Sequence, residues 1–129
     1  MVYKGVIIEE SLERKDVLNL VNIVKTKVEQ VVDEHKTPWL KQWTMHNVEI
    51  NEDVIQEIVK EISGSLEAAH PWYADFKNEN THFVIFRNKV FKINRTKAEQ
   101  YAEAKEYGVS LGIPPYQVDF KPDTKQWER

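Results

Sequence analysis

Hydrophobic and polar positions along this 129-residue chain follow two different periods. In the stretch 72–77 (WYADFK) they alternate, and the stretches 2–10, 39–50 and 82–94 are rich in β-branched and aromatic residues. Both features are typical of β-strands. From Val54 to Leu66 apolar residues instead recur every three or four positions, which predicts an amphipathic helix. We therefore expect a chain that combines strands with helices.

Two helices have recognisable ends in the sequence. The side chain of Asn51 can cap the first turn of a helix over 52–67. The TKAE motif places the hydroxyl of Thr96 three residues before Glu99, which is the spacing of a capping box and predicts the start of a second helix. Gly108 is expected to end that helix.

The stretch 15–32 is open to two interpretations. Valines at alternating steps of four and three form a helical stripe, which favours one long helix: Val17, Val21, Val24, Val28 and Val31. Seven of the residues from 21 to 32 are β-branched, however, and such side chains favour strands over helix interiors. We expect a short helix over 15–20 followed by a strand over 23–32, with the single helix as the alternative.

The stretch 82–94 (HFVIFRNKVFKIN) is typical of a β-hairpin. A two-residue loop at 88–89 would place Phe86 opposite Phe91 and would pair the strands accordingly. One face would then carry Val84, Phe86, Phe91 and Ile93, and the other Ile85, Arg87, Val90 and Lys92.

The order of these elements predicts an α+β fold with a mainly antiparallel sheet and two principal helices packed on one face. No repeat or linker divides the chain, so we expect a single domain over 1–120. The stretch 116–120 (YQVDF) is expected to add an edge strand, and the charged stretch 121–129 is expected to be a flexible tail.

Composition narrows the possible chemistry. The formal net charge is −3, 41% of residues are hydrophobic, and there is no cysteine, which excludes disulfides, thiolate catalysis and cysteine-based metal sites. No apolar run approaches the length of a membrane span, and the N-terminal stretch is not typical of a signal peptide. We therefore expect a cytoplasmic protein with no membrane association.

No motif for catalysis, metal binding or a cofactor was found. The four histidines lie in separate segments without the spacing of metal ligands, and the four glycines form no phosphate-binding loop. We accordingly assign no catalytic residue, metal or cofactor. An enzyme that uses His46, His82 or Asp75 together with Arg87 in a shared pocket remains an alternative.

Charge is distributed unevenly along the chain. Residues 1–70 hold 8 basic and 13 acidic groups, whereas residues 71–129 hold 10 and 8. Five cations fall within the stretch 87–97 without an acid, so Arg87, Lys92 and Arg95 are candidate contacts for an anionic ligand or a nucleic acid. Lysines and arginines also protect sheet edges, and a sequence pI of about 5.8 disfavours nucleic acid as a partner.

Aromatic residues near prolines are the other candidates for a binding surface. We expect Trp43 and Trp72 in the core, whereas Trp39, Tyr73 and Tyr116 are candidate residues for lining a ligand pocket or a partner surface.

Four stretches covering most of the chain resemble a family of small uncharacterised prokaryotic proteins: HKTPWLKQWTMH, HPWYADFKN, HFVIFRNKVFKI and YGVSLGIPPYQVDF. The resemblance implies a free-standing domain and assigns no activity to any residue. We expect a non-enzymatic domain whose partner is a protein or a small-molecule ligand, and a homodimer is compatible with this view. Anion or nucleic-acid binding through 87–97 and the small enzyme are the alternatives.

Overall fold

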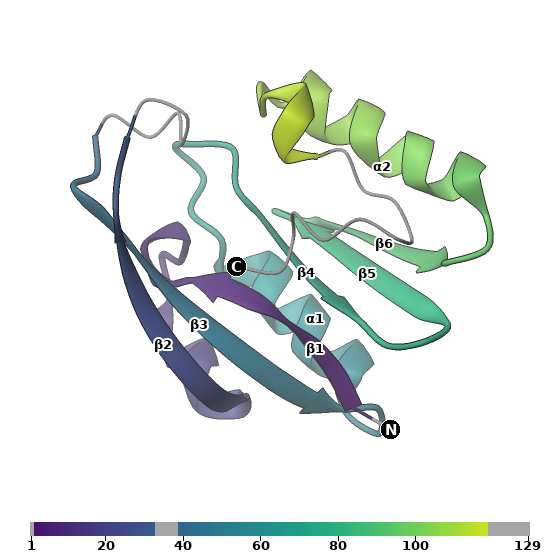
Figure 1. Cartoon of the computed structure of the whole chain (residues 1–129), viewed down its shortest axis with the longest axis horizontal. Coiled ribbons are helices and arrows are strands. Elements are labelled where there is room, and N and C mark those ends of the chain that lie inside the picture. The colour runs from purple at the N-terminus through teal and green to yellow at the C-terminus, as the bar shows by residue number, and fades with distance from the viewer. Residues whose placement is uncertain (1, 33–38, 119–129) are drawn as a thin grey trace.

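The computed structural model describes residues 2–32 and 39–118, which form one six-stranded antiparallel sheet with two α-helices (Figure 1). The strands lie in the order β2-β3-β1-β4-β5-β6. The elements are β1 (Val2–Ile8), η1 (Glu9–Ser11), η2 (Lys15–Leu20), β2 (Asn22–Gln30), β3 (Gln42–Asn51), α1 (Ile55–Ser65), β4 (Tyr73–Lys77), β5 (Thr81–Phe86), β6 (Lys89–Asn94), α2 (Ala98–Ser110) and η4 (Pro115–Gln117). The α+β class, the antiparallel sheet and the two principal helices are confirmed.

The sheet consists of two three-stranded halves, each followed by a helix. The strands β1, β2 and β3 precede α1, and β4, β5 and β6 precede α2. The halves meet where β1 pairs with β4, and Gly5 lies at this junction opposite Phe76. A Cβ atom on Gly5 would lie 1.9 Å from the backbone oxygen of Asp75, so the two strands approach closely because this residue is glycine.

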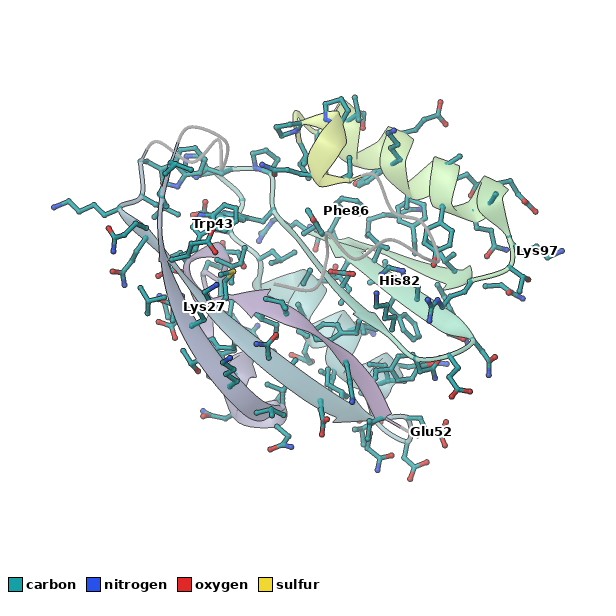
Figure 2. All side chains as sticks on the ribbon, viewed as in Figure 1. Lys27, Trp43, Glu52, His82, Phe86 and Lys97 are labelled. Atoms are coloured by element: carbon teal, nitrogen blue, oxygen red, sulfur yellow. The ribbon has the colours of Figure 1, made fainter. Side chains whose placement is uncertain are left out.

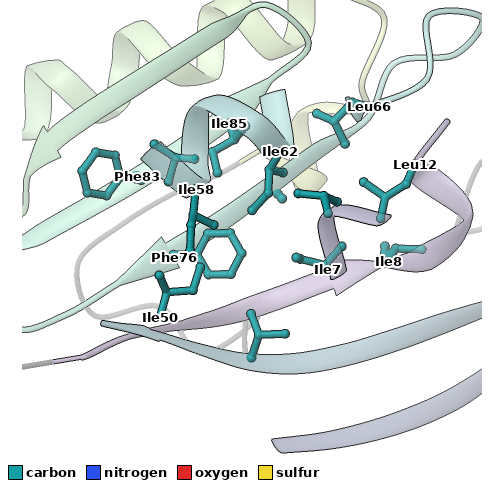
Figure 3. Packing of buried hydrophobic residues seen from close by; sticks show 14 of the residues in the cluster. Ile7, Ile8, Leu12, Ile50, Ile58, Ile62, Leu66, Phe76, Phe83 and Ile85 are labelled. Atoms are coloured by element: carbon teal, nitrogen blue, oxygen red, sulfur yellow. The ribbon is translucent and has the colours of Figure 1, made fainter. Parts of the chain in front are cut away.

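The two helices lie on opposite faces of the sheet, whereas the sequence interpretation placed them on one face. Ile58 and Ile62 of α1 belong to the same buried cluster as Phe83 and Ile85 of β5 (Figure 3). The alternate residues of β5, Val84 and Phe86, belong to a second cluster with Tyr101 and Ala104 of α2. Successive side chains of a strand point to opposite faces, so β5 is covered on both sides and is apolar almost throughout.

The stretch 15–32 forms a short helix followed by a strand, which confirms the expected interpretation. The segment η2 spans Lys15–Leu20 as a 3-10 helix, and β2 follows as Asn22–Gln30, so the single long helix is excluded. The register between β2 and β3 shifts between Ile23 and Lys25, which indicates a β-bulge at this point.

The β5–β6 hairpin has the predicted faces but a register that differs by two residues. The loop is Arg87-Asn88, so Phe86 pairs with Lys89 and Phe91 pairs with Val84. Asn88 has a φ of 59°, in the left-handed region that asparagine tolerates better than most residues, and this places the turn one residue earlier than expected. A shift of two residues leaves every side chain on its predicted face.

Both helices differ from the prediction at their ends. Asn51 accepts a hydrogen bond from the Asp53 N–H at 2.9 Å, but it caps a turn, and α1 begins at Ile55. Thr96 makes no capping box, because its N–H and hydroxyl donate to Asn94 instead. The second helix continues through Gly108 to Ser110.

The end of α2 is set by Gly112 rather than by Gly108. Gly112 has a φ of 99°, and the Ile113 N–H bonds the Gly108 carbonyl at 3.1 Å, which is the pattern of a Schellman motif. Gly108 packs instead against Phe86 and Val118.

The chain after α2 also differs from expectation. Residues Pro115–Gln117 form a 3-10 helix and not the start of an edge strand. The predicted tail 121–129 lies outside the described residues.

Candidate functional site

A cleft of about 770 Å³ lies on the face of the sheet that carries α2, over the part that α2 leaves uncovered. Its floor is formed by side chains of β1, β3 and β4 that alternate toward this face, and its wall includes the residues that follow β4 and β6. The lining residues are Val2, Lys4, Gly5, Val6, Val24, Asn47, Val48, Glu49, Asp75, Lys77, Asn78, Glu79 and Arg95.

A buried polar network lies beside this cleft. The Nε2 atom of His82 on β5 lies 2.7 Å from Oδ2 of Asp75 on β4, and its Nδ1 lies 3.1 Å from the hydroxyl of Tyr101 on α2. Figure 2 shows His82 on the part of the sheet next to α2. His82 is 1% exposed and Tyr101 4%, whereas Asp75 reaches the cleft. The strand register explains the contact, because Asp75 and His82 lie diagonally opposite on one face of β4 and β5.

The chemistry of the three groups indicates one consistent arrangement of donors and acceptors. A carboxylate accepts, so Nε2 of His82 donates to Asp75, and in the neutral ring Nδ1 then accepts from the Tyr101 hydroxyl. Burial raises the pKa of Tyr101 above its ordinary 10.0, while the charge and hydrogen bond of Arg95 oppose part of the shift. The hydroxyl therefore keeps its proton at neutral pH.

Arg95 connects this network with the rim of the cleft. It directly follows β6, and its guanidinium donates to the carbonyl oxygen of Asn78 at 2.6 Å. The cleft is thus lined by both a cation, Arg95, and an anion, Asp75.

The complete lining has balanced charge. Its cations are Lys4, Lys77 and Arg95, and its acids are Glu49, Asp75 and Glu79. Lys4 and Glu49 lie 3.8 Å apart on the strand surface as an exposed ion pair. Valines contribute apolar surface between these groups. Such a lining can contact apolar groups and hydrogen-bond or pair with groups of either charge.

The structure separates the three cations proposed from the sequence. Arg87 donates to the carbonyl oxygen of Leu66 and lies 3.4 Å from Oε1 of Glu13. Lys92 lies over the ring of Phe83 at 6.0 Å. Of Arg87, Lys92 and Arg95, Arg95 alone lines the cleft, so the stretch 87–97 does not present these three cations as one cluster.

The candidate aromatic residues also occupy different places. Trp39 is 43% exposed and stacks on His70, with ring centroids 3.6 Å apart. Tyr73 packs on the α2 face, where its hydroxyl donates to the Gln117 carbonyl at 2.6 Å. The side chain of Tyr116 lies outside the described part. Trp43 and Trp72 are buried at 5% and 7% exposure, which confirms their expected core positions.

Of the groups considered for an enzyme, Asp75 and His82 meet, whereas Arg87 and His46 lie elsewhere. His46 is buried between Glu9 and Thr26, at 3.0 Å from the Glu9 carboxylate and 2.8 Å from the Thr26 hydroxyl. Sequence reasoning did not find the roles of Arg95 and Tyr101. Polar residues within otherwise apolar strands mark Asp75 and His82, but Arg95 follows β6 and Tyr101 lies on α2, so this signal does not indicate them.

Comparison with known proteins identifies no relative, because no family model, curated protein or solved structure matches this chain. Among residues 2–32 and 39–118, no group of three or more histidine, aspartate and glutamate side chains is placed to hold a metal ion. None of the helices in the same part of the chain has the length and hydropathy needed to cross a lipid bilayer.

Proposed function

We propose that this chain is a binding domain for a small molecule that carries both a cationic and an anionic group, held in the cleft over β1, β3 and β4. The observation that carries the proposal is the position of Asp75. Its carboxylate lines the cleft, and one of its oxygens is held at 2.7 Å by the buried His82. An anion held in place in this way offers a fixed contact for an amine or guanidinium group.

The remaining lining supports a ligand of mixed charge. Arg95 and Lys77 place positive charge in the lining, which favours a carboxylate or phosphate group on the ligand, and the valines can contact a short apolar body. A simple anion would meet the acids Glu49, Asp75 and Glu79, and a simple cation would meet Lys4, Lys77 and Arg95. The balance of charges therefore favours a zwitterion over either.

The experiment is a titration with free amino acids, followed by amide chemical shifts in NMR spectra. Each amino acid is compared with its N-acetyl derivative, which lacks the cation, and with its amide, which lacks the anion. We expect shifts at Val6, Asn47 and Lys77 with the zwitterion and at least tenfold weaker binding for both derivatives. Absence of shifts at these positions at millimolar ligand, or shifts confined to other faces, would contradict the proposal.

A variant that fills the cleft provides an independent test. Asn47→Trp adds an indole to the floor from a half-buried position, without removing any group of the buried network. It should abolish ligand-induced shifts while the folded spectrum persists. The matched control is Lys60→Trp on the exposed side of α1, which should bind as the unaltered protein does.

Proton transfer is a second candidate function, favoured by the chain of hydrogen bonds that joins Asp75, His82 and Tyr101. In this function Asp75 would accept a proton from a substrate in the cleft, and His82 would orient the carboxylate without touching the substrate. Exchange of substrate protons into D2O, measured with small carbon acids, should then require Asp75. Exchange that persists in Asp75→Asn would exclude this function.

A further inference from the structure

The outer edge of β2 is an exposed and partly apolar strand edge. In the described part of the chain β2 pairs with β3 and with no second strand, so it forms one border of the sheet (Figure 1). Almost all of its side chains are exposed, including Ile23 at 39%, Val24 at 60% and Val28 at 52%. Exposed strand edges of this kind can pair with a further strand.

A hydrogen bond made by the neighbouring strand β3 shows which N–H and C=O groups of β2 face the open edge. Thr44 lies opposite Val28, but its N–H donates to the carboxylate of Glu10 at 2.6 Å and so points away from β2. In an antiparallel pair, two opposite residues either exchange hydrogen bonds or both point away from each other. Val28 therefore directs its N–H and C=O toward the open edge, and the period of two extends this orientation to Thr26 and Gln30.

We propose that a second copy of this chain adds to β2 in antiparallel orientation, with a two-fold axis at Val28, so that the two sheets become continuous. This inference concerns an edge of the sheet and does not rest on the proposed ligand cleft, which β2 lines only through Val24. A two-fold axis perpendicular to a sheet places one residue opposite its own copy and fixes all other pairs.

The charges of β2 select this register. With the axis at Val28, each Lys27 lies opposite a Glu29, Thr26 lies opposite Gln30, and the two Val28 side chains meet. An axis at Thr26 would place Lys25 opposite Lys27, and an axis at Lys27 would place that lysine opposite itself. Opposite charges across a strand pair stabilise it and like charges destabilise it, so the axis at Val28 is more favourable than an axis at Thr26 or Lys27.

The other border of the sheet lacks this self-complementarity. The strand β6 carries Lys89 and Lys92 and no acid, so an antiparallel copy would gain no ion pair there. Figure 2 shows Lys27 on β2, at the border of the sheet distant from α2. This difference between the two borders favours β2 as the dimer edge.

Charge exchange tests the register directly by sedimentation velocity over a range of protein concentrations. Lys27→Glu and Glu29→Lys should each weaken self-association about tenfold, because both ion pairs at the interface become like-charged. The double variant Lys27→Glu/Glu29→Lys should dimerise as the unaltered chain does. A mixture of the two single variants should form a heterodimer, because glutamates of one chain then face lysines of the other.

A proline variant tests the backbone contact. Val28→Pro removes an N–H that faces the open edge and that β3 does not use, so the fold should persist while self-association is lost. The control is Lys92→Glu on β6, which should leave self-association unchanged. A chain that remains monomeric at millimolar concentration, single charge variants that associate undiminished, or an equal loss in Lys92→Glu would overturn the proposal.

Discussion

Individual polar residues in the sheet connect the fold to the cleft. Asp75 and His82 are polar residues at buried strand positions, and each is stabilised because the other supplies a hydrogen-bond partner. Tyr101 adds the contact that ties α2 to the same pair. A buried network of this kind depends on all of its members, because a partner left alone remains desolvated without compensation.

This dependence predicts a strong coupling between Asp75 and His82. His82→Phe leaves the Asp75 carboxylate without its buried partner and should lower the free energy of unfolding by about 3 to 5 kcal/mol. The double variant His82→Phe/Asp75→Leu replaces both polar groups and should recover most of that loss. Urea denaturation of the unaltered, single and double variants measures the coupling. Losses that simply add in the double variant would show that the pair contributes no coupling.

The raised pKa of Tyr101 predicts that the contribution of this residue to stability decreases at alkaline pH. Because burial raises its pKa in the folded protein, the folded state holds a proton that the unfolded state releases above pH 10.0. The stability linked to this proton is complete below pH 10.0 and is lost as the pH rises toward the raised pKa. The difference in unfolding free energy between the unaltered protein and Tyr101→Phe should therefore shrink over this range. Denaturation curves at pH 8 to 11 test the sign, and a difference that grows with pH would contradict it.

At the scale of secondary-structure elements, the two helical glycines are expected to respond oppositely to the same substitution. Gly64 in α1 has open space where a Cβ would lie, so Gly64→Ala should raise the free energy of unfolding by about 0.5 to 1 kcal/mol. Gly108 in α2 has Val118 Cγ1 at 2.8 Å and Phe86 at 3.2 Å from that position, so Gly108→Ala should lower it by about 1 to 3 kcal/mol. Thermal unfolding of both variants measures whether each substitution stabilises or destabilises the protein. A Gly108→Ala variant more stable than the unaltered protein would show that the cluster around Phe86 and Val118 can rearrange at little cost in free energy.

For the molecule as a whole, we expect the junction between the two halves of the sheet to tolerate substitution poorly. Gly5→Ala would bring a Cβ to 1.9 Å from the Asp75 oxygen, and a backbone oxygen cannot move without separating β1 from β4. We expect a loss of more than about 3 kcal/mol. Lys4→Ala, at the neighbouring exposed position, should change stability by less than about 0.5 kcal/mol. Circular dichroism during urea unfolding compares the two, and equal midpoints would contradict the junction argument.

The same junction explains why the cleft exists. The strands β1 and β3 extend the sheet beyond the area that α2 covers, and the uncovered face carries the charged residues that line the cleft. The sequence did not predict this cleft, because its lining comes from β1, β2, β3 and β4 and from the segments after β4 and β6. Arg95 was a candidate because of its charge, but its position beside Tyr101 depends on the packing of α2.

Most of the local structure could be predicted from the sequence. The period of two and the β-branched residues predicted all six strands, and the period of three and four predicted α1, because both signals arise from side chains within one element. The faces of the β5–β6 hairpin were also correct. Its register was not, because the positive φ of Asn88 selects the turn and apolar alternation is unchanged by a shift of two residues.

The tertiary structure decided what depends on contacts between distant segments. It placed α1 and α2 on opposite faces of the sheet, whereas periodicity shows which side of a helix is apolar and not which face of the sheet it will cover. It placed Nε2 of His82 at 2.7 Å from Oδ2 of Asp75. It also placed Arg95, but not Arg87, in the lining of the cleft. Local side-chain patterns determined the elements of this protein, and the order in which its strands pair determined which residues meet, because strand order depends on long-range packing that no local pattern encodes.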